Sequence, residues 1–500
     1  MSSNSSRNNH IAVFFKGSII SLIGVLILGI INFLIRRTLA LTLSSEDFGF
    51  LYSAISLCMI FLSYLDLGLN QSATILLSKS LSESNKKKSN SIYTIFLSTK
   101  FLCAFAVFLI LAFTYKFWLN DFFKYKKFAP YFAIITILIS NAIVSAPYAI
   151  LTALKKFILL YASYIFSPLL ILVTIFTIRI NNEILVPAII FPLSAFVVFI
   201  ALSFLIAKFG FVPRYKYIKN SEALKSIFHL SKWVAISTAG LSTMYYLDSL
   251  MITYFRTLQE VALYNVALPV MQVAQSLMVI PNVFIPIVSE MWQKGEIRKI
   301  ADICTIITEF FFYLLWPIIF TIILLSKHLI VFLFSSKFTD ASTALIILFI
   351  GNIFFSLASF YMGTLNAGTN AKNVTYSIIT GNIVNIILNI TLIPVFGITG
   401  AATATTLSYF SILIFLFFKM QSTLKYQLKF FNKKTILIIT IGLSGIILAL
   451  LFSNHTLKIM LGIAFFLNII YFIITYKKLK EYFNSISKII FKNNNQSIIL

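Results

Sequence analysis

Long apolar runs, each close to the thickness of a bilayer, constrain this chain more than any other feature of its sequence. A helix needs about 20 apolar residues to cross the hydrocarbon core of a membrane. Runs of this length succeed one another along the 500 residues, with only short polar loops between them. Charged residues make up 11% of the chain, whereas soluble proteins carry about 25%. The sequence therefore predicts an all-α integral membrane protein.

A scan at this length gives about fourteen transmembrane spans. They cover residues 11–35, 48–77, 92–115, 128–154, 158–178, 184–207, 233–255, 261–289, 303–325, 341–365, 374–396, 400–418, 435–452 and 457–476. The longest polar break follows the sixth span. We therefore expect an N-terminal lobe at 1–207, a basic cytoplasmic linker at 208–232, a C-terminal lobe at 233–418, and a final region at 419–500 that holds a helix pair and a basic tail. In the linker, the spacing of Leu224, Ile227, Phe228 and Leu230 fits either an amphipathic helix on the membrane surface or a solvated loop.

Basic residues are distributed unevenly between alternate loops. With the N-terminus placed in the cytoplasm, the cytoplasmic loops carry more than twice as many lysines and arginines as the outer loops. This is the bias of the positive-inside rule, and it predicts that both termini are cytoplasmic. The main exception is the outer loop from Lys116 to Lys127, which contains four lysines.

The net charge of +25 does not indicate nucleic-acid binding, because the basic residues lie between apolar spans. Orientation signals and attraction to lipid headgroups account for them better. Cys58, Cys103 and Cys304 are far apart in apolar runs, and the four histidines are scattered. This spacing fits neither a zinc site nor a disulfide framework, so we expect no metal and no cofactor.

A short motif occurs twice. The segment SEDFGFLYSA, around Glu46 and Tyr52, corresponds to LQEVALYNVA, around Glu260 and Tyr264. Each copy lies between two apolar spans and begins a helix after an acidic turn. Because each lobe has six spans, an even number, both lobes enter the membrane from the same side, and the repeat is parallel.

Several segments together resemble polysaccharide flippases of the Wzx type: NFLIRRTLALTLSSEDFGFLYSAISL, YLDLGLNQSA, YYLDSLMITYF, EVALYNVA and VFIPIVSEMWQKG. These flippases belong to the multidrug/oligosaccharidyl-lipid/polysaccharide (MOP) exporter superfamily, together with lipid II flippases and MATE drug antiporters. The resemblance covers the first twelve spans. It implies two six-helix lobes in a V around a cavity that opens alternately to each side of the membrane.

The resemblance also implies a substrate, an oligosaccharide on a polyprenyl pyrophosphate. A cavity must replace the water around its charged headgroup, and arginine or lysine suits pyrophosphate. The candidate cations are Arg36, Arg37, Lys100 and Arg256. One of Arg36 and Arg37 is expected to face the cavity and the other the headgroups. Lys100 is either a cavity cation, a buried partner of Asp66 or a snorkelling lysine, and Arg256 is either a ligand or a loop anchor.

Two acidic residues lie within spans. Asp248 and Asp66 are candidates for coupling transport to a proton or a sodium ion, and Asp66 is also placed to brace the end of its helix. Glu309 is expected near a helix start, in a structural role. Tyr245 and Tyr246 are candidates for stacking on sugar rings, as are Tyr264 and Tyr361, since all four have polar neighbours in the sequence.

Three functions fit this pattern to different degrees. The basic candidates favour a flippase for O-antigen or capsule repeat units in the bacterial inner membrane, with membrane lipids and a polysaccharide polymerase as partners. A MATE-like, cation-coupled drug antiporter is the alternative, although a site for cations would carry more acids. A membrane glycosyltransferase or polymerase fits least. The pair Glu46 and Asp47 faintly resembles the acidic pair of such enzymes, but no outer loop is long enough for their extracytoplasmic domain. We therefore expect no enzymatic activity.

Overall fold

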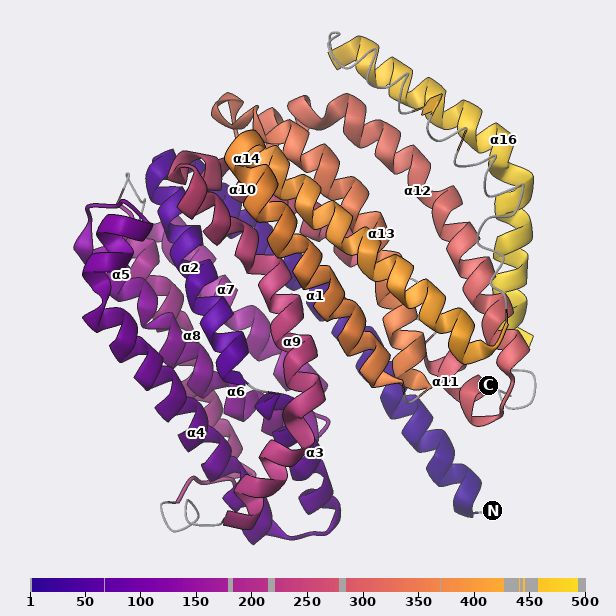
Figure 1. Ribbon diagram of the computed structural model, residues 1–500. Helices are drawn as coiled ribbons and strands as arrows, with labels where there is room; N and C mark the ends of the chain where they lie inside the picture. Colours follow the sequence, from indigo (N-terminus) through magenta and orange to yellow (C-terminus); the bar gives the residue numbers. More distant parts are fainter. Residues whose placement is uncertain are drawn as a thin grey trace. The chain divides into compact units, whose positions relative to one another are not determined.

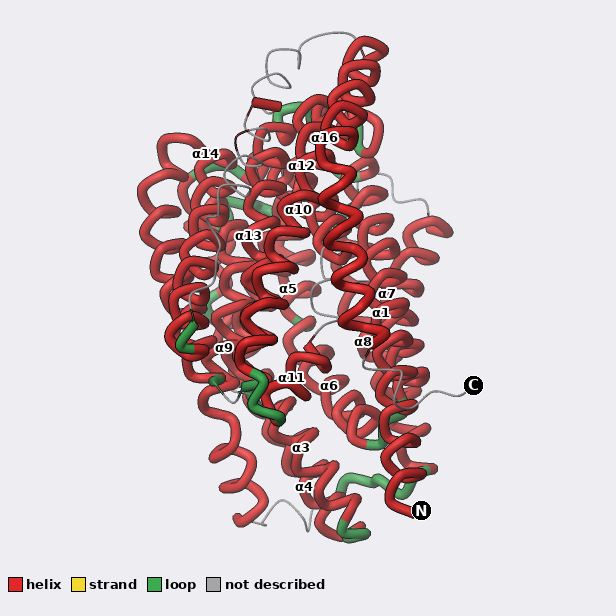
Figure 2. Tube along the Cα trace, turned by 90° about the vertical axis from the view of Figure 1, so that its right-hand side faces the viewer, coloured by secondary structure: helices red, strands yellow, loops and turns green. Residues whose placement is uncertain are grey.

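Helices form nearly all of the described chain in the computed structural model. The structure describes residues 2–66, 68–178, 183–214, 221–277, 285–368, 370–426, 440, 444–445 and 457–492. Within these ranges it contains no strand (Figure 2). The prediction of an all-α protein is confirmed.

Ten helices in the described ranges are long and apolar enough to cross a membrane. They lie at Ile23–Thr42, Ser45–Asp66, Lys86–Phe113, Phe128–Ala153, Phe157–Ile178, Leu185–Lys208, Ile297–Leu333, Ala341–Ala367, Ala371–Leu424 and Leu457–Tyr482. A multi-pass membrane protein is confirmed, but the number fourteen is not. One helix, α14 (Ala371–Leu424), covers two expected spans, and α9 (Ser221–Phe255) and α10 (Leu258–Leu277) are not among the ten. The expected span at 435–452 lies almost entirely outside the described residues.

The chain forms two compact units. Unit 1 comprises residues 1–276 and 385–401, and unit 2 comprises 277–384 and 402–500. Unit 1 therefore contains helices from both predicted lobes. The two lobes were predicted from the repeated motif, whereas the two units are defined by contacts. The division into lobes therefore stays a prediction.

Unit 1 is built on helices α1 to α10. In chain order they are α1 (Ser2–Thr42), α2 (Ser45–Asp66), α3 (Leu69–Ser82), α4 (Lys86–Phe113), the π-helix η1 (Phe117–Phe122), α5 (Phe128–Ile135), α6 (Ile137–Ala153), α7 (Phe157–Ile178), α8 (Leu185–Lys208), α9 and α10. Helix α1 packs along α7, and α2 packs along α9 (Figure 1). The α2 and α9 helices run antiparallel, since Ser53 meets Thr253 while Tyr64 meets Thr243.

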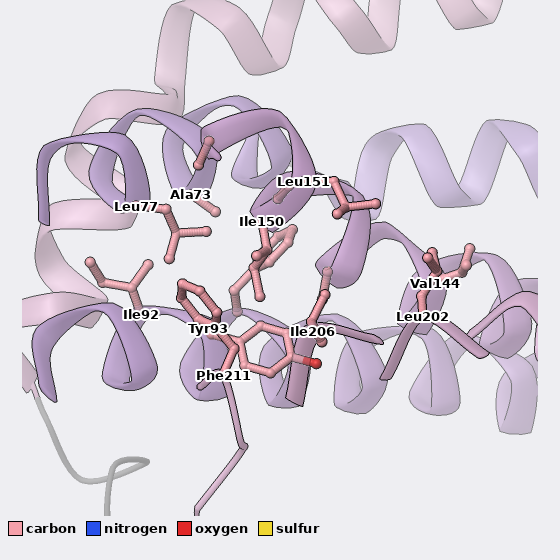
Figure 3. Packing of buried hydrophobic residues seen from close by; sticks show 14 of the residues in the cluster. Ala73, Leu77, Ile92, Tyr93, Val144, Ile150, Leu151, Leu202, Ile206 and Phe211 are labelled. Carbon is pink, nitrogen blue, oxygen red and sulfur yellow. The ribbon is translucent and has the colours of Figure 1, made fainter. Parts of the chain in front are cut away.

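A hydrophobic cluster closes one end of unit 1. It joins α3, α4, α6 and α8, and its side chains include Leu77, Tyr93, Ile150 and Ile206 (Figure 3). Phe211, in the segment that follows α8, completes the cluster and is only 5% exposed. This segment is thus packed against the helices rather than free of them.

Helix boundaries differ from the expected spans at functionally important places. Helix α1 continues to Thr42, so Arg36 and Arg37 lie inside a helix and not at its end. The expected span 48–77 is two helices, because Gly68 adopts a left-handed conformation with φ +69° between α2 and α3. Since glycine has no Cβ, it takes this conformation without steric cost.

The second half of the predicted linker is not a separate surface helix. Helix α9 begins at Ser221 and runs without interruption to Phe255. The stretch from Leu224 to Leu230 is therefore helical, as the first alternative required, and a loop there is wrong. Its position on the membrane surface stays a prediction. The linker residues 215–220 lie outside the described residues.

Unit 2 is organised around one long helix, α12 (Ile297–Leu333). It packs against α13 (Ala341–Ala367) and α16 (Leu457–Lys492), while the short α11 (Ile285–Gln293) contacts both α12 and α13 (Figure 1). Hydrogen bonds fasten α16: Tyr471 donates to the Tyr313 carbonyl at 3.0 Å and Asn468 donates to the Thr321 hydroxyl at 3.0 Å.

Candidate transport site

Arg36 lies in the interior of unit 1 beside an aromatic ring. Its guanidinium carbon is 4.4 Å from the centroid of the Tyr52 ring, a cation–π distance. The side chain is partly buried, and its Nη1 atom is fully buried with no hydrogen-bond partner among the described residues. A buried donor without a partner is costly, so this nitrogen is ready to bind an acceptor.

Tyr52 and Tyr246 bring two further helices to this arginine. Tyr52 belongs to α2 and is 6% exposed. Tyr246 belongs to α9 and is close enough to interact electrostatically with Arg36. The structure therefore assembles one guanidinium and two phenols from α1, α2 and α9. Arg37 and Tyr245 were also predicted as site residues. Both are partly buried, and they are the sequence neighbours of Arg36 and Tyr246.

Lys100 and Asp66 form a buried ion pair. Lys100 lies in α4 and Asp66 is the last residue of α2, and the two side chains are 6% and 10% exposed. The Lys100 ammonium also lies 5.9 Å from the centroid of the Phe96 ring. The sequence left three placements open for Lys100, and the structure shows the second, a buried partner of Asp66.

Asp248 lies at the centre of a buried polar cluster. Its Oδ2 accepts a hydrogen bond from the Tyr264 hydroxyl at 2.6 Å, and its Oδ1 accepts one from the Asn389 amide at 2.8 Å. The Asn389 amide also donates to Asn385 at 3.1 Å. The carboxylate is 2% exposed, and Asn389 Oδ1 is buried without a hydrogen-bond partner among the described residues. These oxygens are of the kind that hold a proton or a hard cation.

Three members of this cluster were not predicted in this role. Tyr264 was expected to stack on sugar, and Asn385 and Asn389 were not singled out. A signal was nevertheless present, since Asn385 and Asn389 are four residues apart in an apolar run and so share a helix face. Their pairing with Asp248, 141 residues away from Asn389, is a tertiary contact that no local pattern reveals.

Arg256 forms an ion pair at the end of α9. Its Nε is 2.9 and 3.1 Å from the two carboxylate oxygens of Glu260, and its Nη1 donates to the Pro394 carbonyl at 3.3 Å. Gly397, with φ +56°, interrupts α14 next to this pair. The structure thus places Arg256 as an anchor for the break in α14.

Asp47 anchors the basic segment from Lys116 to Lys127. It accepts hydrogen bonds from the Tyr125 hydroxyl and from Lys127 at 2.7 and 2.9 Å, and Phe50 stacks on the Tyr125 ring at 3.8 Å. Burial and the contact with Asp47 raise the pKa of Tyr125, so the phenol stays protonated and donates. Asp47 is 4% exposed and already accepts hydrogen bonds from two side chains, so it is unlike the free acidic pair of an enzyme. Its ion pair with Lys127 also neutralises one of the four lysines that made this segment an exception to the positive-inside rule.

Glu309 and Tyr361 belong to the interior of unit 2. Glu309 lies well inside α12, which begins at Ile297, so the expectation that it is close to a helix start is wrong. It accepts a hydrogen bond from Tyr482 of α16. Tyr361 is 1% exposed and its hydroxyl lies 3.0 Å from that of Thr308, so its ring packs in the core.

Many long apolar helices with charged groups buried among them define a polytopic membrane protein. The fold is that of the lipid II flippase MurJ in an inward closed conformation, with a TM-score of 0.73 and 17% identity over 93% of this chain and 99% of that one. An inward-facing MATE multidrug transporter of the MOP superfamily matches with a TM-score of 0.63 and 12% identity over 80% and 94%. At these identities the likeness concerns the fold.

The chain belongs to the family described as polysaccharide biosynthesis protein, which matches residues 14–292, more than half of its length. An uncharacterized membrane protein of Methanocaldococcus jannaschii, MJ1068, is 27% identical over 83% of this chain and 85% of its own length. The probable low-salt glycan biosynthesis flippase Agl15 of Haloferax volcanii is 30% identical over 37% of this chain and 39% of its own length. The resemblance to MOP-superfamily polysaccharide exporters is confirmed.

Proposed function

We propose that this protein is a flippase that moves polyprenyl-pyrophosphate-linked oligosaccharides from the cytoplasmic to the outer leaflet for surface polysaccharide synthesis. The observation that carries this proposal is Arg36, whose buried Nη1 has no partner among the described residues and whose guanidinium lies against Tyr52. A guanidinium suits a pyrophosphate and phenols suit sugar hydroxyls and rings. Family membership supports the same function.

Of the other predicted ligands, Arg37 and Tyr245 adjoin this group in sequence and stay candidates. Arg256 is assigned to the α14 anchor instead, because Glu260 and a backbone carbonyl already occupy it. Lys100 is assigned to a brace with Asp66, because a lysine paired and buried in this way is not available to a headgroup. Asp66 is accordingly no longer a candidate for ion coupling.

Transport by alternating access is coupled to an ion gradient through Asp248. A carboxylate that is buried, and held by Tyr264 and Asn389, changes its interactions strongly when it gains a proton or a sodium ion. The same fold serves MATE transporters, so a drug antiporter is the competing function. The partly buried Arg36, with its buried Nη1, favours an anionic substrate over a cationic drug.

The protein acts as a transporter and not as an enzyme, with membrane lipids and a polysaccharide polymerase as its partners. It lies in the plasma membrane with both termini cytoplasmic, in keeping with the bias of its basic residues. The O-antigen or capsule substrate and the bacterial inner membrane rest on the Wzx-type resemblance. Both relatives named above are archaeal, so we assign the chain more broadly to surface glycans.

Deletion of the gene tests this function. Lipid-linked repeat units are expected to accumulate on the cytoplasmic face, as measured by the protection of their sugars from an impermeant lectin or oxidant. Increased drug sensitivity with unchanged surface glycan would instead indicate the antiporter.

Arg36→Ala tests the site. Loss of a hydrogen-bonded charge costs about 1.5–3 kcal/mol, so we expect transport to fall roughly 10- to 100-fold, with partial recovery in Arg36→Lys, which keeps the charge but not the planar fork. Arg298→Ala, at an exposed position, is the matched control. Normal export by Arg36→Ala at normal protein levels would remove this residue from the site.

A further inference from the structure

One end of unit 1 gathers exposed basic side chains from three turns that are distant in sequence. The turns are the one between α3 and α4, the one between α6 and α7, and the segment that follows α8. The basic patch consists of Lys79, Lys86, Lys87, Lys88, Lys155, Lys156, Lys208 and Arg214, all exposed. Within the segments 79–88, 155–156 and 208–214, Glu83 is the one acidic residue, and Lys88 pairs with it at 3.1 Å.

A side-chain clamp fixes the geometry of the basic patch. The amide of Asn90 donates to the Gly210 carbonyl at 3.1 Å and accepts from the Val212 backbone N–H at 3.1 Å. The Thr94 hydroxyl accepts from the Arg214 backbone N–H at 3.2 Å. The Asn90 amide and the Thr94 hydroxyl, one turn later in α4, thus hold the segment 210–214. The side chain of Phe211 is buried in the hydrophobic cluster (Figure 3).

Apolar side chains stand among the lysines. Phe209 is 38% exposed and Val212 is 41% exposed, although the chain around them is fixed. The Lys156 ammonium lies 6.0 Å from the centroid of the Phe209 ring. An exposed aromatic ring flanked by lysines suits the membrane interface, where the ring enters the acyl boundary and the ammonium groups reach phosphates.

We infer that the basic patch is a docking site for the headgroups of anionic phospholipids. Charge complementarity requires an anionic occupant, and the exposed Phe209 and Val212, at and just beyond the end of α8, favour a lipid surface over an acidic protein. All three turns are among those expected on the cytoplasmic side, where anionic lipids attract basic residues. This inference does not depend on the transported substrate, because it concerns a surface outside the candidate transport site.

Lys155 provides a first test of this inference. It ends α6 in the left-handed region, with φ +57°, where a glycine is favoured. A lysine at such a position is strained, so Lys155→Gly both relieves strain and removes a charge. We expect this variant to melt at a higher temperature than the wild type in phosphatidylcholine nanodiscs, and to gain less from added phosphatidylglycerol.

Direct lipid binding provides the main test. The probe is fluorescent phosphatidylglycerol, titrated into the full-length chain in neutral detergent. Each lysine near an anionic surface contributes about fivefold in affinity, so Lys86→Gln, Lys87→Gln and Lys156→Gln together are expected to weaken binding roughly 100-fold. Phe209→Ser is expected to weaken it as well, but to leave competition by soluble glycerol phosphate unchanged.

The outer loop offers a control with the same change of charge. Lys116→Gln, Lys124→Gln and Lys126→Gln together remove three exposed lysines away from the patch, and we expect phosphatidylglycerol affinity to stay within about twofold of the wild type. Equal losses in the two triple variants, or undiminished affinity in the patch variant, would overturn the inference. Binding of an acidic protein without any preference for phosphatidylglycerol would overturn it too.

Discussion

Lys100 and Asp66 show what a paired charge does in a membrane interior. Each offsets part of the other's cost of burial, and neither side chain is more than 10% exposed. Breaking a buried pair by removing one partner costs about 3–5 kcal/mol, whereas replacing both with apolar residues is often neutral. The two residues are therefore best tested together.

We predict that Lys100→Met lowers the thermal midpoint of the detergent-solubilised protein by several degrees, and that adding Asp66→Leu restores most of the loss. Transport by the double variant shows whether Lys100 braces the helices or binds the substrate. If Lys100 is a brace, the stable double variant still exports glycan at a rate near that of the wild type. A double variant that is stable but inactive would return Lys100 to the substrate site.

Asp248 accepts hydrogen bonds from two neutral donors, Tyr264 and Asn389. Asp248→Asn keeps the size and much of the hydrogen bonding but cannot bind a proton or attract a cation at pH 7. We predict a folded protein whose transport in proteoliposomes no longer responds to an imposed proton or sodium gradient. The control is Ser249→Ala, which alters the neighbouring pair of Ser249 and Asn265 without touching the carboxylate. A gradient response retained in Asp248→Asn would place the coupling elsewhere.

At the scale of elements, breaks in helices decide where side chains point. Helix α14 is interrupted at Gly397, whose φ of +56° and ψ of −130° are accessible mainly to glycine. A Cβ added there would collide with Glu260 and approach Arg256, the pair that binds the Pro394 carbonyl. The break and its anchor are thus one structural unit.

We predict that Gly397→Ala destabilises the protein by about 2 kcal/mol or more, since this sparsely populated positive-φ conformation alone costs a residue with a Cβ about 1–3 kcal/mol. The thermal midpoint in detergent measures this. Gly29→Ala in α1 is the matched control, because an added Cβ meets no atom within 4 Å there. It should be neutral or stabilising by up to about 1 kcal/mol, and equal destabilisation by both substitutions would contradict this account.

Apolar length predicted the helices, but it could not predict their ends. Arg36 looked like the end of a span because two charges follow an apolar run, yet α1 continues to Thr42. The partly buried Arg36 side chain lies against Tyr52, so the helix tolerates the charge there. Conversely, Gly68 breaks a span that reads as continuous, because a single glycine is a weak signal within an apolar run. In both cases a tertiary contact or one dihedral angle outweighs the local pattern.

At the scale of the whole molecule, the sequence predicted the all-α membrane class and the family resemblance, since both follow from patterns along the chain. Its site residues were predicted as a set of charges, and the structure sorts them by partner. Lys100 is paired with Asp66 and Arg256 with Glu260, while Arg36 keeps an unpaired nitrogen. Pairing over such sequence separations depends on how helices pack, which local periodicity does not encode.

Within unit 1, α2 and α9 bring the two predicted lobes into contact. The hydroxyls of Ser53 and Thr253 lie 2.5 Å apart, although the residues are 200 positions apart. If transport proceeds by alternating access between the predicted lobes, as proposed above, the lobes separate at one side of the membrane in turn and this contact opens in each cycle. In a background without Cys58, Cys103 and Cys304, we predict that Ser53→Cys with Thr253→Cys loses transport on oxidation and regains it with a reductant.

A second cysteine pair separates a block of lobe movement from a general effect of oxidation. Ser80 and Ser89 have hydroxyls 2.8 Å apart, but both lie in the N-terminal lobe, at the turn between α3 and α4. Ser80→Cys with Ser89→Cys should therefore form a disulfide and leave transport near the rate of the cysteine-free protein. Full activity of the oxidised Ser53/Thr253 pair, with cross-linking verified by mass spectrometry, would mean that α2 and α9 stay together throughout the cycle. The helices that move apart during transport would then have to be others than α2 and α9.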